Sequence, residues 1–231
     1  MKTFAFIGMG NMGQAMLKGC LKVFSKNDLT FTDVSEQNCQ KVKEATGVEF
    51  VGTALECLNV AKCIVLAVKP QVYPVVLSQL KGKLNPDQLI ISIAPSYSIA
   101  QLKEALGDQV RVVRAMPNTP AMVGEGMSGV CFSEDLFLDE ERSMVYAFFN
   151  SFGKMEEVPE HLINAVTVAS GSSPAFVYMF IEALADGGVR AGIKRSDAML
   201  WAAQAVMGAA KLVIESGEHP GALKDAVCSP K

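Results

Sequence analysis

Short apolar runs alternate with longer amphipathic stretches between Met1 and Gly153. This alternation is typical of βαβ units built around a parallel sheet, and continuous apolar runs fit strands that are buried on both faces. The pattern predicts an α/β fold with a doubly wound parallel sheet. Strands are expected at residues 3–7, 30–33, 63–67, 89–93, 110–115 and 129–132. Helices fill the gaps, the first of them over residues 12–22.

The pattern changes after Pro159, where strand-like runs stop and two long helical stretches follow, residues 174–185 and 197–215. We therefore expect a sheet domain over residues 1–155 and a small all-helical domain over residues 160–231. Gly187-Gly188 is expected to end the first helix, Ser196 to cap the second and Gly217 to stop it.

The second of these helices is apolar on nearly every side, so a single amphipathic stripe does not describe it. A domain of about 70 residues buries too small a fraction of its surface to cover two such helices alone. A second copy of the chain would supply the missing cover, which predicts a homodimer. Gln204 and Lys211 interrupt the apolar stretch, and it falls short of the roughly 20 residues of a spanning helix. We expect no membrane partner.

Composition narrows the function classes. Hydrophobic residues make up 50% of the 231 residues and charged residues 19%, which excludes a disordered chain. The net charge is −3, without a basic cluster, so no nucleic-acid partner is expected. Two distant histidines and six cysteines without a C-x-x-C pair argue against a metal site. The scattered cysteines fit free thiols in a reducing cytoplasm, since no secretory leader is recognised.

The first predicted strand runs directly into the motif G-x-G-x-x-G, formed by Gly8, Gly10 and Gly13. A strand before the motif, a helix after it and Asp33 at the end of the second strand make it specific for a dinucleotide. Gly8 permits a tight turn, Gly10 lets the backbone approach a pyrophosphate, and Gly13 allows close packing of helix and strand. The expected domain is therefore of the Rossmann type, with NADPH or NADH as cofactor.

Asp33 follows Gly13 by twenty residues, the position of an acid that accepts from the ribose 2′-hydroxyl of NAD. Taken alone, this position favours NADH. Thr32 and Ser35 flank it and would hold a phosphate if the carboxylate turned away, and Asp at a strand end also serves as a plain turn residue.

Three further segments are candidates for binding. Lys69 follows a strand at its carboxyl end, where its ammonium meets an anionic group or lies in a solvated loop. Two prolines fix the loop around Asn118, which is either a structural turn or a cofactor clamp. Residues 170–174 place serine hydroxyls before Pro174 at an expected helix N-terminus, which is either a carboxylate cradle or an ordinary cap.

A nucleophilic triad lacks a suitably placed histidine, and no carboxylate pair suggests glycosidase chemistry. Hydride transfer demands less of the protein, because the cofactor carries the chemistry.

With these motifs in place, the chain resembles the pyrroline-5-carboxylate reductase family over essentially its whole length. The matching segments are GMGNMG at residues 8–13, LAVKP at 66–70, VVRAMPNTPAMVGEG at 112–126, ASGSSPAF and IEALADGGVRAG within 169–192, and HPGALKDAVCSP at 219–230. Several motifs in the right order are more specific than any single one.

The resemblance implies NADPH- or NADH-dependent reduction of 1-pyrroline-5-carboxylate to L-proline, the last step of proline biosynthesis. It implies a helical dimerisation domain, and further assembly into a ring of dimers. Carried over by position, the cofactor-binding residues are Gly8, Met9, Gly10, Asn11, Met12, Gly13, Ala67, Val68, Lys69, Met116 and Asn118, beside Asp33 from the motif itself. The substrate-binding residues are Ser170, Gly171, Ser172, Ser173 and Pro174. No catalytic residue is assigned, and we expect a hydroxyl or water to protonate the imine nitrogen.

Departures from the family pattern keep two alternatives open. The family reads SGSGPAY where this chain has Ser173 and Phe176, and AG where Ala94-Pro95 stands. Family members also continue beyond SP with a loop that contacts substrate, so we expect either a truncated helical domain or a longer protein. The alternatives are a non-catalytic cofactor-binding or dimerisation module, and a related hydroxy-acid dehydrogenase, for which neither Lys194 nor His161 is convincingly placed.

Overall fold

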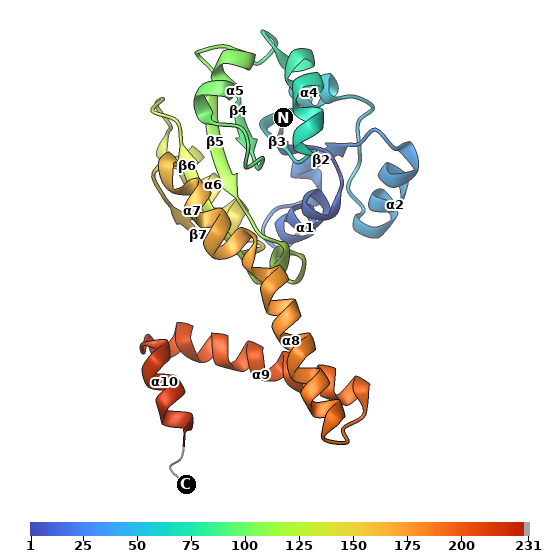
Figure 1. The fold of residues 1–231 in the computed structure, drawn as a ribbon. Helices are drawn as coiled ribbons and strands as arrows, with labels where there is room; N and C mark the ends of the chain where they lie inside the picture. Colours follow the sequence, from blue (N-terminus) through green and yellow to red (C-terminus); the bar gives the residue numbers. More distant parts are fainter. Residues whose placement is uncertain (229–231) are drawn as a thin grey trace. The chain divides into compact units, whose positions relative to one another are not determined.

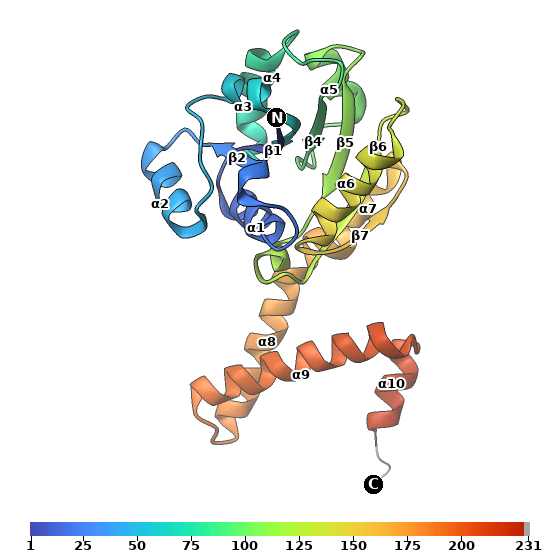
Figure 2. The same ribbon diagram turned by 180° about the vertical axis from the view of Figure 1, so that it is seen from behind.

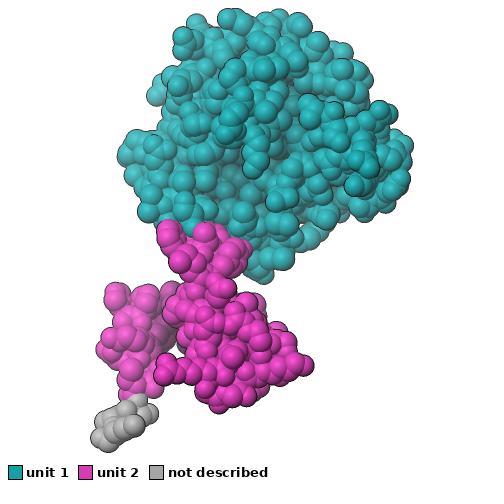
Figure 3. Space-filling view, turned by 45° about the vertical axis from the view of Figure 1, so that its right-hand side comes forward, with its two compact units in different colours: residues 1–172 teal, residues 173–231 magenta. Residues whose placement is uncertain are grey.

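A computed structural model describes residues 1–228 and divides the chain into two compact units, which Figure 3 colours separately. The first unit is Met1–Ser172, and the second begins at Ser173. The division falls after the expected boundary between residues 155 and 160, because residues 160–172 form helical segments that pack against the sheet of the first unit.

The first unit contains a seven-stranded sheet in the order β2-β1-β3-β4-β5-β6-β7. Its strands are β1 (Lys2–Ile7), β2 (Leu29–Thr32), β3 (Ala61–Leu66), β4 (Leu89–Ser92), β5 (Arg111–Met116), β6 (Gly126–Phe132) and β7 (Gly153–Glu157). The first five strands are parallel, β6 runs antiparallel to β5, and β7 runs parallel to β6. The α/β fold and all six expected strands are confirmed.

The structure departs from the expected sheet in its last two strands. They reverse direction, so the sheet is mostly rather than wholly parallel. The edge strand β7 was not predicted, because its sequence GKMEE is polar and only half-buried. The period-2 apolar pattern that marks a strand does not appear in so short an edge segment.

Helices cover both faces of this sheet (Figures 1 and 2). Phe4 and Phe6 of β1 point into a core shared with α1 (Asn11–Cys20), α2 (Glu36–Thr46) and α6 (Asp139–Asn150). Ala5 and Ile7 point to the opposite core, shared with α3 (Ala54–Val60), α4 (Tyr73–Leu80) and α5 (Ile99–Leu106). Successive side chains of a strand alternate between faces, so a continuous apolar run serves two cores at once.

Short helical segments complete the first unit: η1 (Lys26–Asp28), η2 (Pro70–Val72), η3 (Thr119–Val123), η4 (Glu160–Leu162), α7 (Ile163–Val166) and the π-helical turn η5 (Thr167–Gly171). The segment α7 packs against β5 and β6. One continuous helical path, Glu160–Arg190, runs from η4 into the second unit.

The second unit consists of α8 (Ser173–Arg190), α9 (Arg195–Ser216) and α10 (Pro220–Val227). Gly217 ends α9 in the left-handed conformation, as expected. The expected stop at Gly187-Gly188 is wrong, because both glycines lie inside α8. There the missing side chain of Gly188 allows close packing, since a Cβ would lie 3.2 Å from that of Ala198. Lys194, not Ser196, occupies the N-cap of α9.

Only Ala185, Ala198 and Ala202 are buried apolar residues in the described part of the second unit. Large side chains such as Phe176, Leu200 and Trp201 are more than half exposed. Contrary to the sequence expectation, Glu160–Arg190 and Arg195–Ser216 are long and apolar enough to cross a membrane by length and composition. These helices leave an extensive apolar surface uncovered in a single copy of the chain.

Candidate active site

A cavity of about 840 Å³ lies at the carboxyl ends of β1, β2, β3 and β4. The strand order reverses between β2 and β3, which flank β1 on opposite sides, and such a switch point is where open α/β sheets bind ligands. Of the predicted cofactor-binding residues, the cavity is lined by Gly8, Gly10, Asn11, Met12, Asp33, Ala67, Val68 and Lys69. The structure therefore brings most of the predicted dinucleotide site together.

The glycines of the turn after β1 each meet a different constraint. Gly8 has a φ of +102°, and a Cβ there would lie 2.8 Å from a Val68 methyl group. A Cβ on Gly13 would overlap the carbonyl oxygen of Gly8, so this glycine lets α1 pack on the turn. Gly10 is different, because no described atom lies within 4 Å of its Cβ position. Neighbouring protein atoms therefore exclude a side chain at Gly8 and at Gly13. At Gly10 no atom of the described residues does so.

These properties fit a dinucleotide pyrophosphate. Gly10 lines the cavity and is the N-cap of α1, and within residues 1–228 no side chain caps this end of the helix. The first-turn N–H groups and the helix dipole therefore face the space beside Gly10, where an anion is favoured. The absence of a side chain at Gly10 keeps that space open for phosphate oxygens.

Met9 is fully buried, and its backbone is held on both sides. Its N–H donates to Asp33 Oδ2 at 2.7 Å. Its carbonyl accepts from Gln14 Nε2 at 2.8 Å and from Asn38 Nδ2 at 3.0 Å. Three side chains from α1, α2 and the end of β2 thereby fix the glycine-rich turn in one position.

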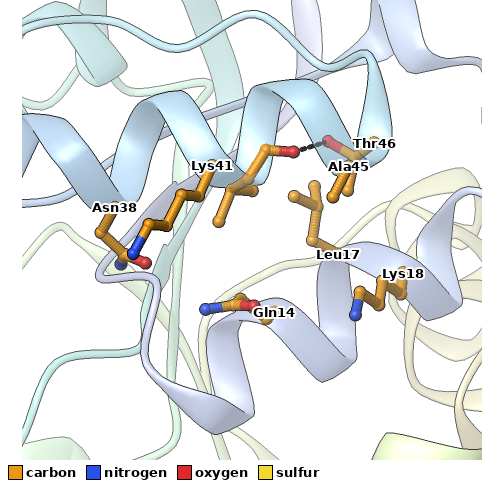
Figure 4. A pocket seen from close by; sticks show the side chains of 8 residues that line it. Gln14, Leu17, Lys18, Asn38, Lys41, Ala45 and Thr46 are labelled. Carbon is orange, nitrogen blue, oxygen red and sulfur yellow. Dashed lines mark hydrogen bonds between the residues drawn. The ribbon is translucent and has the colours of Figure 1, made fainter.

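Gln14 and Asn38 also line a smaller pocket of about 260 Å³ between α1 and α2. Figure 4 shows Asn38 and Lys41 on α2 facing Gln14, Leu17 and Lys18 on α1. Sequence reasoning missed Gln14 and Asn38, because a polar residue on a helix gives no sign that its side chain reaches Met9, which lies five residues before Gln14 and 29 before Asn38.

Both polar atoms of the Asn118 side-chain amide form hydrogen bonds within the protein. Its Oδ1 accepts from Met127 N at 2.8 Å, and its Nδ2 donates to Ser170 O at 3.1 Å. Ser170 precedes Pro174 by four residues, and proline has no N–H to complete that helical bond. The Asn118 amide therefore satisfies a carbonyl that Pro174 leaves without a helical donor. The structure supports the structural-turn interpretation of this loop, whereas the cofactor contact stays a prediction.

The helix α8 begins at Ser173, close to the predicted start, but the chain is already helical before it, so residues 170–174 do not form the free helix N-terminus that was expected. Ser172 N donates to Thr167 O at 2.8 Å, and the Ser170 hydroxyl donates to Val166 O at 3.2 Å. The chain passes through a π-helical turn instead of a free N-terminus, because the π-turn absorbs the bond that Pro174 cannot make. Met116 contacts Gly171, since a Cβ on that glycine would lie 2.6 Å from the Met116 methyl group.

Burial favours the neutral form of three ionisable side chains in the sheet domain. Burial raises the pKa of the Cys20 and Cys57 thiols to about 12, and it raises the pKa of Tyr73 to about 12. The Tyr73 hydroxyl donates to Leu66 O at 2.9 Å and lies 3.1 Å from Ser92 Oγ. Among residues 1–228, no three His, Cys, Asp or Glu side chains form a group that would hold a metal ion.

A doubly wound sheet with a glycine-rich turn at its switch point defines a dinucleotide-binding protein of the Rossmann type. Comparison with protein families agrees: residues 3–96 match the family of NADP oxidoreductases described as coenzyme F420-dependent, and residues 160–231 match the pyrroline-5-carboxylate reductase dimerisation family. The chain belongs to the pyrroline-5-carboxylate reductase family, as its sequence motifs predicted.

Individual relatives support this assignment. The chain is 44% identical to the pyrroline-5-carboxylate reductase of Escherichia coli, over 99% of this chain and 86% of that protein. It is 39% identical to the pyrroline-5-carboxylate reductase of Methanosarcina acetivorans, over 99% of this chain and 85% of that protein. Among solved structures, the NADP-bound reductase of Plasmodium falciparum matches with a TM-score of 0.88 and 32% identity, covering 99% of this chain and 85% of that one. The Coxiella burnetii reductase matches with a TM-score of 0.90 and 29% identity, covering 99% of this chain and 86% of that one.

Proposed function

We propose that this chain reduces the C=N bond of 1-pyrroline-5-carboxylate with NADPH or NADH to give L-proline, the last step of proline biosynthesis. The observation that carries the proposal is an open dinucleotide cavity, with its glycine-rich turn fixed in place, in a chain that belongs to this reductase family over 99% of its length. The coenzyme, when bound, supplies the hydride.

The residues of the chain bind the coenzyme and the substrate and orient them relative to each other. The turn at residues 8–13 and the N-terminus of α1 would hold the pyrophosphate, because their free N–H groups face the cavity beside Gly10. Ala67, Val68 and Lys69 border the other flank of the cavity, where the exposed Lys69 ammonium would meet an anionic group of coenzyme or substrate. Positioning two reactants in this way supplies much of the acceleration that hydride transfer needs.

The imine nitrogen also needs a proton. The hydroxyls of Ser170 and Thr167 both donate to helix carbonyl groups, at 3.2 and 3.1 Å, so each is already engaged. We therefore propose that water or another hydroxyl donates the proton, and Ser170, Gly171, Ser172, Ser173 and Pro174 remain the proposed border of the substrate.

We further propose a homodimer, formed through α8 and α9, that assembles into a ring of dimers in the cytoplasm. The second copy would cover the apolar side chains that one copy leaves exposed, including Phe176, Leu200 and Trp201. We propose that protein rather than lipid covers them, because Arg195, Glu182 and Asp186 form ion pairs between α8 and α9 that a bilayer would disfavour.

The test is a substrate panel with the purified chain. We expect NADH or NADPH oxidation, followed by nicotinamide absorbance, with racemic 1-pyrroline-5-carboxylate and none with 2-keto acids. The Escherichia coli relative serves as the positive control. Oxidation with 2-keto acids alone would favour the hydroxy-acid dehydrogenase alternative. Coenzyme binding without turnover of either substrate class would favour the non-catalytic module.

A further inference from the structure

The adenosine end of the cavity carries fixed negative charge. Asp33 lines the cavity at the end of β2, the position that faces the adenosine ribose in this class of sheet. Its Oδ2 accepts from Met9 N at 2.7 Å and its Oδ1 accepts from Ser35 N at 3.0 Å. Two backbone donors, one on each side, hold the carboxylate where it is. It does not turn away, so the flanking residues Thr32 and Ser35 are not free to hold a phosphate in its place.

The surrounding segments supply no compensating cation. Residues 29–40 and 48–60, which border this end of the cavity, contain neither lysine nor arginine. They carry Glu36 in the first turn of α2, and Glu56, which binds Gly52 N at 3.2 Å beside the cavity. Lys69 is the one cationic side chain among the described residues that line the cavity, and it follows β3, on the opposite side of β1.

Other basic side chains near α2 are directed elsewhere. Lys43 pairs with Glu49 at 2.7 Å. Lys41 lines the smaller pocket between α1 and α2, where Figure 4 shows its side chain beside Asn38. Val34, the residue directly after Asp33, lines the cavity and is fully exposed, so a long side chain at this position would have free space.

We infer that this site selects NADH over NADPH, with Asp33 as the residue that determines the preference. A ribose 2′-hydroxyl donates to the fixed carboxylate, whereas a 2′-phosphate places a second anion against it with no cation to offset the repulsion. The inference rests on the proposed function, because it specifies which coenzyme that function uses.

The test measures coenzyme binding by isothermal titration without any imine, so that it reports on selection apart from turnover. We expect the Kd of NADH to be about tenfold or more below that of NADPH. V34R adds a cation at an exposed position outside the core, and we expect it to lower the Kd of NADPH at least about tenfold relative to that of NADH. Asp33→Asn keeps an acceptor for one backbone N–H and removes the charge. It should therefore raise the Kd of NADH and lower the Kd of NADPH, which brings the two values closer together.

Asp28→Asn is the matched control, because Asp28 precedes the same strand at its other end and does not line the cavity. It should leave both Kd values unchanged. Equal affinity for the two coenzymes in the unmodified chain, or tighter binding of NADPH, would overturn the inference. If NADH binds selectively but the imine is not reduced, the selectivity stands and the proposed reductase function fails. If neither coenzyme binds, both fail.

Discussion

A substitution at Gly10 should weaken cofactor binding while leaving the stability of the fold nearly unchanged. Its φ of −69° and ψ of −172° are open to alanine, and no described atom lies within 4 Å of the added Cβ. Alanine caps a helix about 1 kcal/mol less well than glycine, but it lowers the entropy of the unfolded chain, which stabilises the fold by about 0.4–1 kcal/mol. The two effects nearly cancel, so Gly10→Ala should change the free energy of unfolding by no more than about 0.5 kcal/mol.

Binding should respond differently, because the new methyl group would occupy the space that the pyrophosphate needs. Losing two charge-assisted hydrogen bonds at about 1.5 kcal/mol each removes about 3 kcal/mol, which is roughly a 100-fold rise in coenzyme Kd. Urea unfolding followed by circular dichroism gives the free energy of unfolding, and isothermal titration gives the coenzyme Kd. Gly13→Ala is the matched contrast, since its Cβ would overlap the Gly8 carbonyl oxygen and should lower stability by about 1–3 kcal/mol. A Gly10→Ala protein of unchanged stability that binds coenzyme normally would refute the assignment of the pyrophosphate to this space.

Three further outcomes follow from the contacts and exposed surfaces. Asn118→Leu leaves Met127 N and Ser170 O without their partner, and should lower the free energy of unfolding in urea by about 2–3 kcal/mol. Because burial raises the pKa of Cys20 and Cys57 from 9.0 to about 12, their protons leave the unfolded chain first; thermal melts should show stability falling between pH 9 and 12 as these thiols ionise in the unfolded chain. Light scattering should find at least a dimer and should find Trp201→Glu shifted toward monomer; an unmodified monomer would contradict the role given to α8 and α9.

The turn at residues 8–13 was predictable from sequence because everything that defines it is local. A buried strand, three glycines at fixed spacing and a helix follow one another within twenty residues. The alternation of Phe4 and Phe6 with Ala5 and Ile7 likewise needed no long-range information, since both faces of the strand are buried.

What sequence could not show depends on contacts between distant segments. Asn38 holds the carbonyl of Met9, 29 residues earlier in the chain, only because α2 lies beside the glycine-rich turn. Pro174 looked like a helix start, yet the chain is already helical before it, because the π-turn and the Asn118 amide together compensate for the missing N–H. Gly187 and Gly188 looked like a stop, whereas packing against α9 keeps α8 intact.

The central claim is that this chain delivers hydride from a nicotinamide coenzyme to a cyclic imine carbon. The most direct measurement incubates the chain with 1-pyrroline-5-carboxylate and NADH carrying deuterium at both hydrogen positions of nicotinamide C4, and analyses the product by mass spectrometry. The account predicts L-proline with one deuterium on C5, the carbon of the former C=N bond, and a smaller amount of this labelled proline when Gly10→Ala is used. Unlabelled proline, or no proline while the coenzyme remains bound, would contradict it.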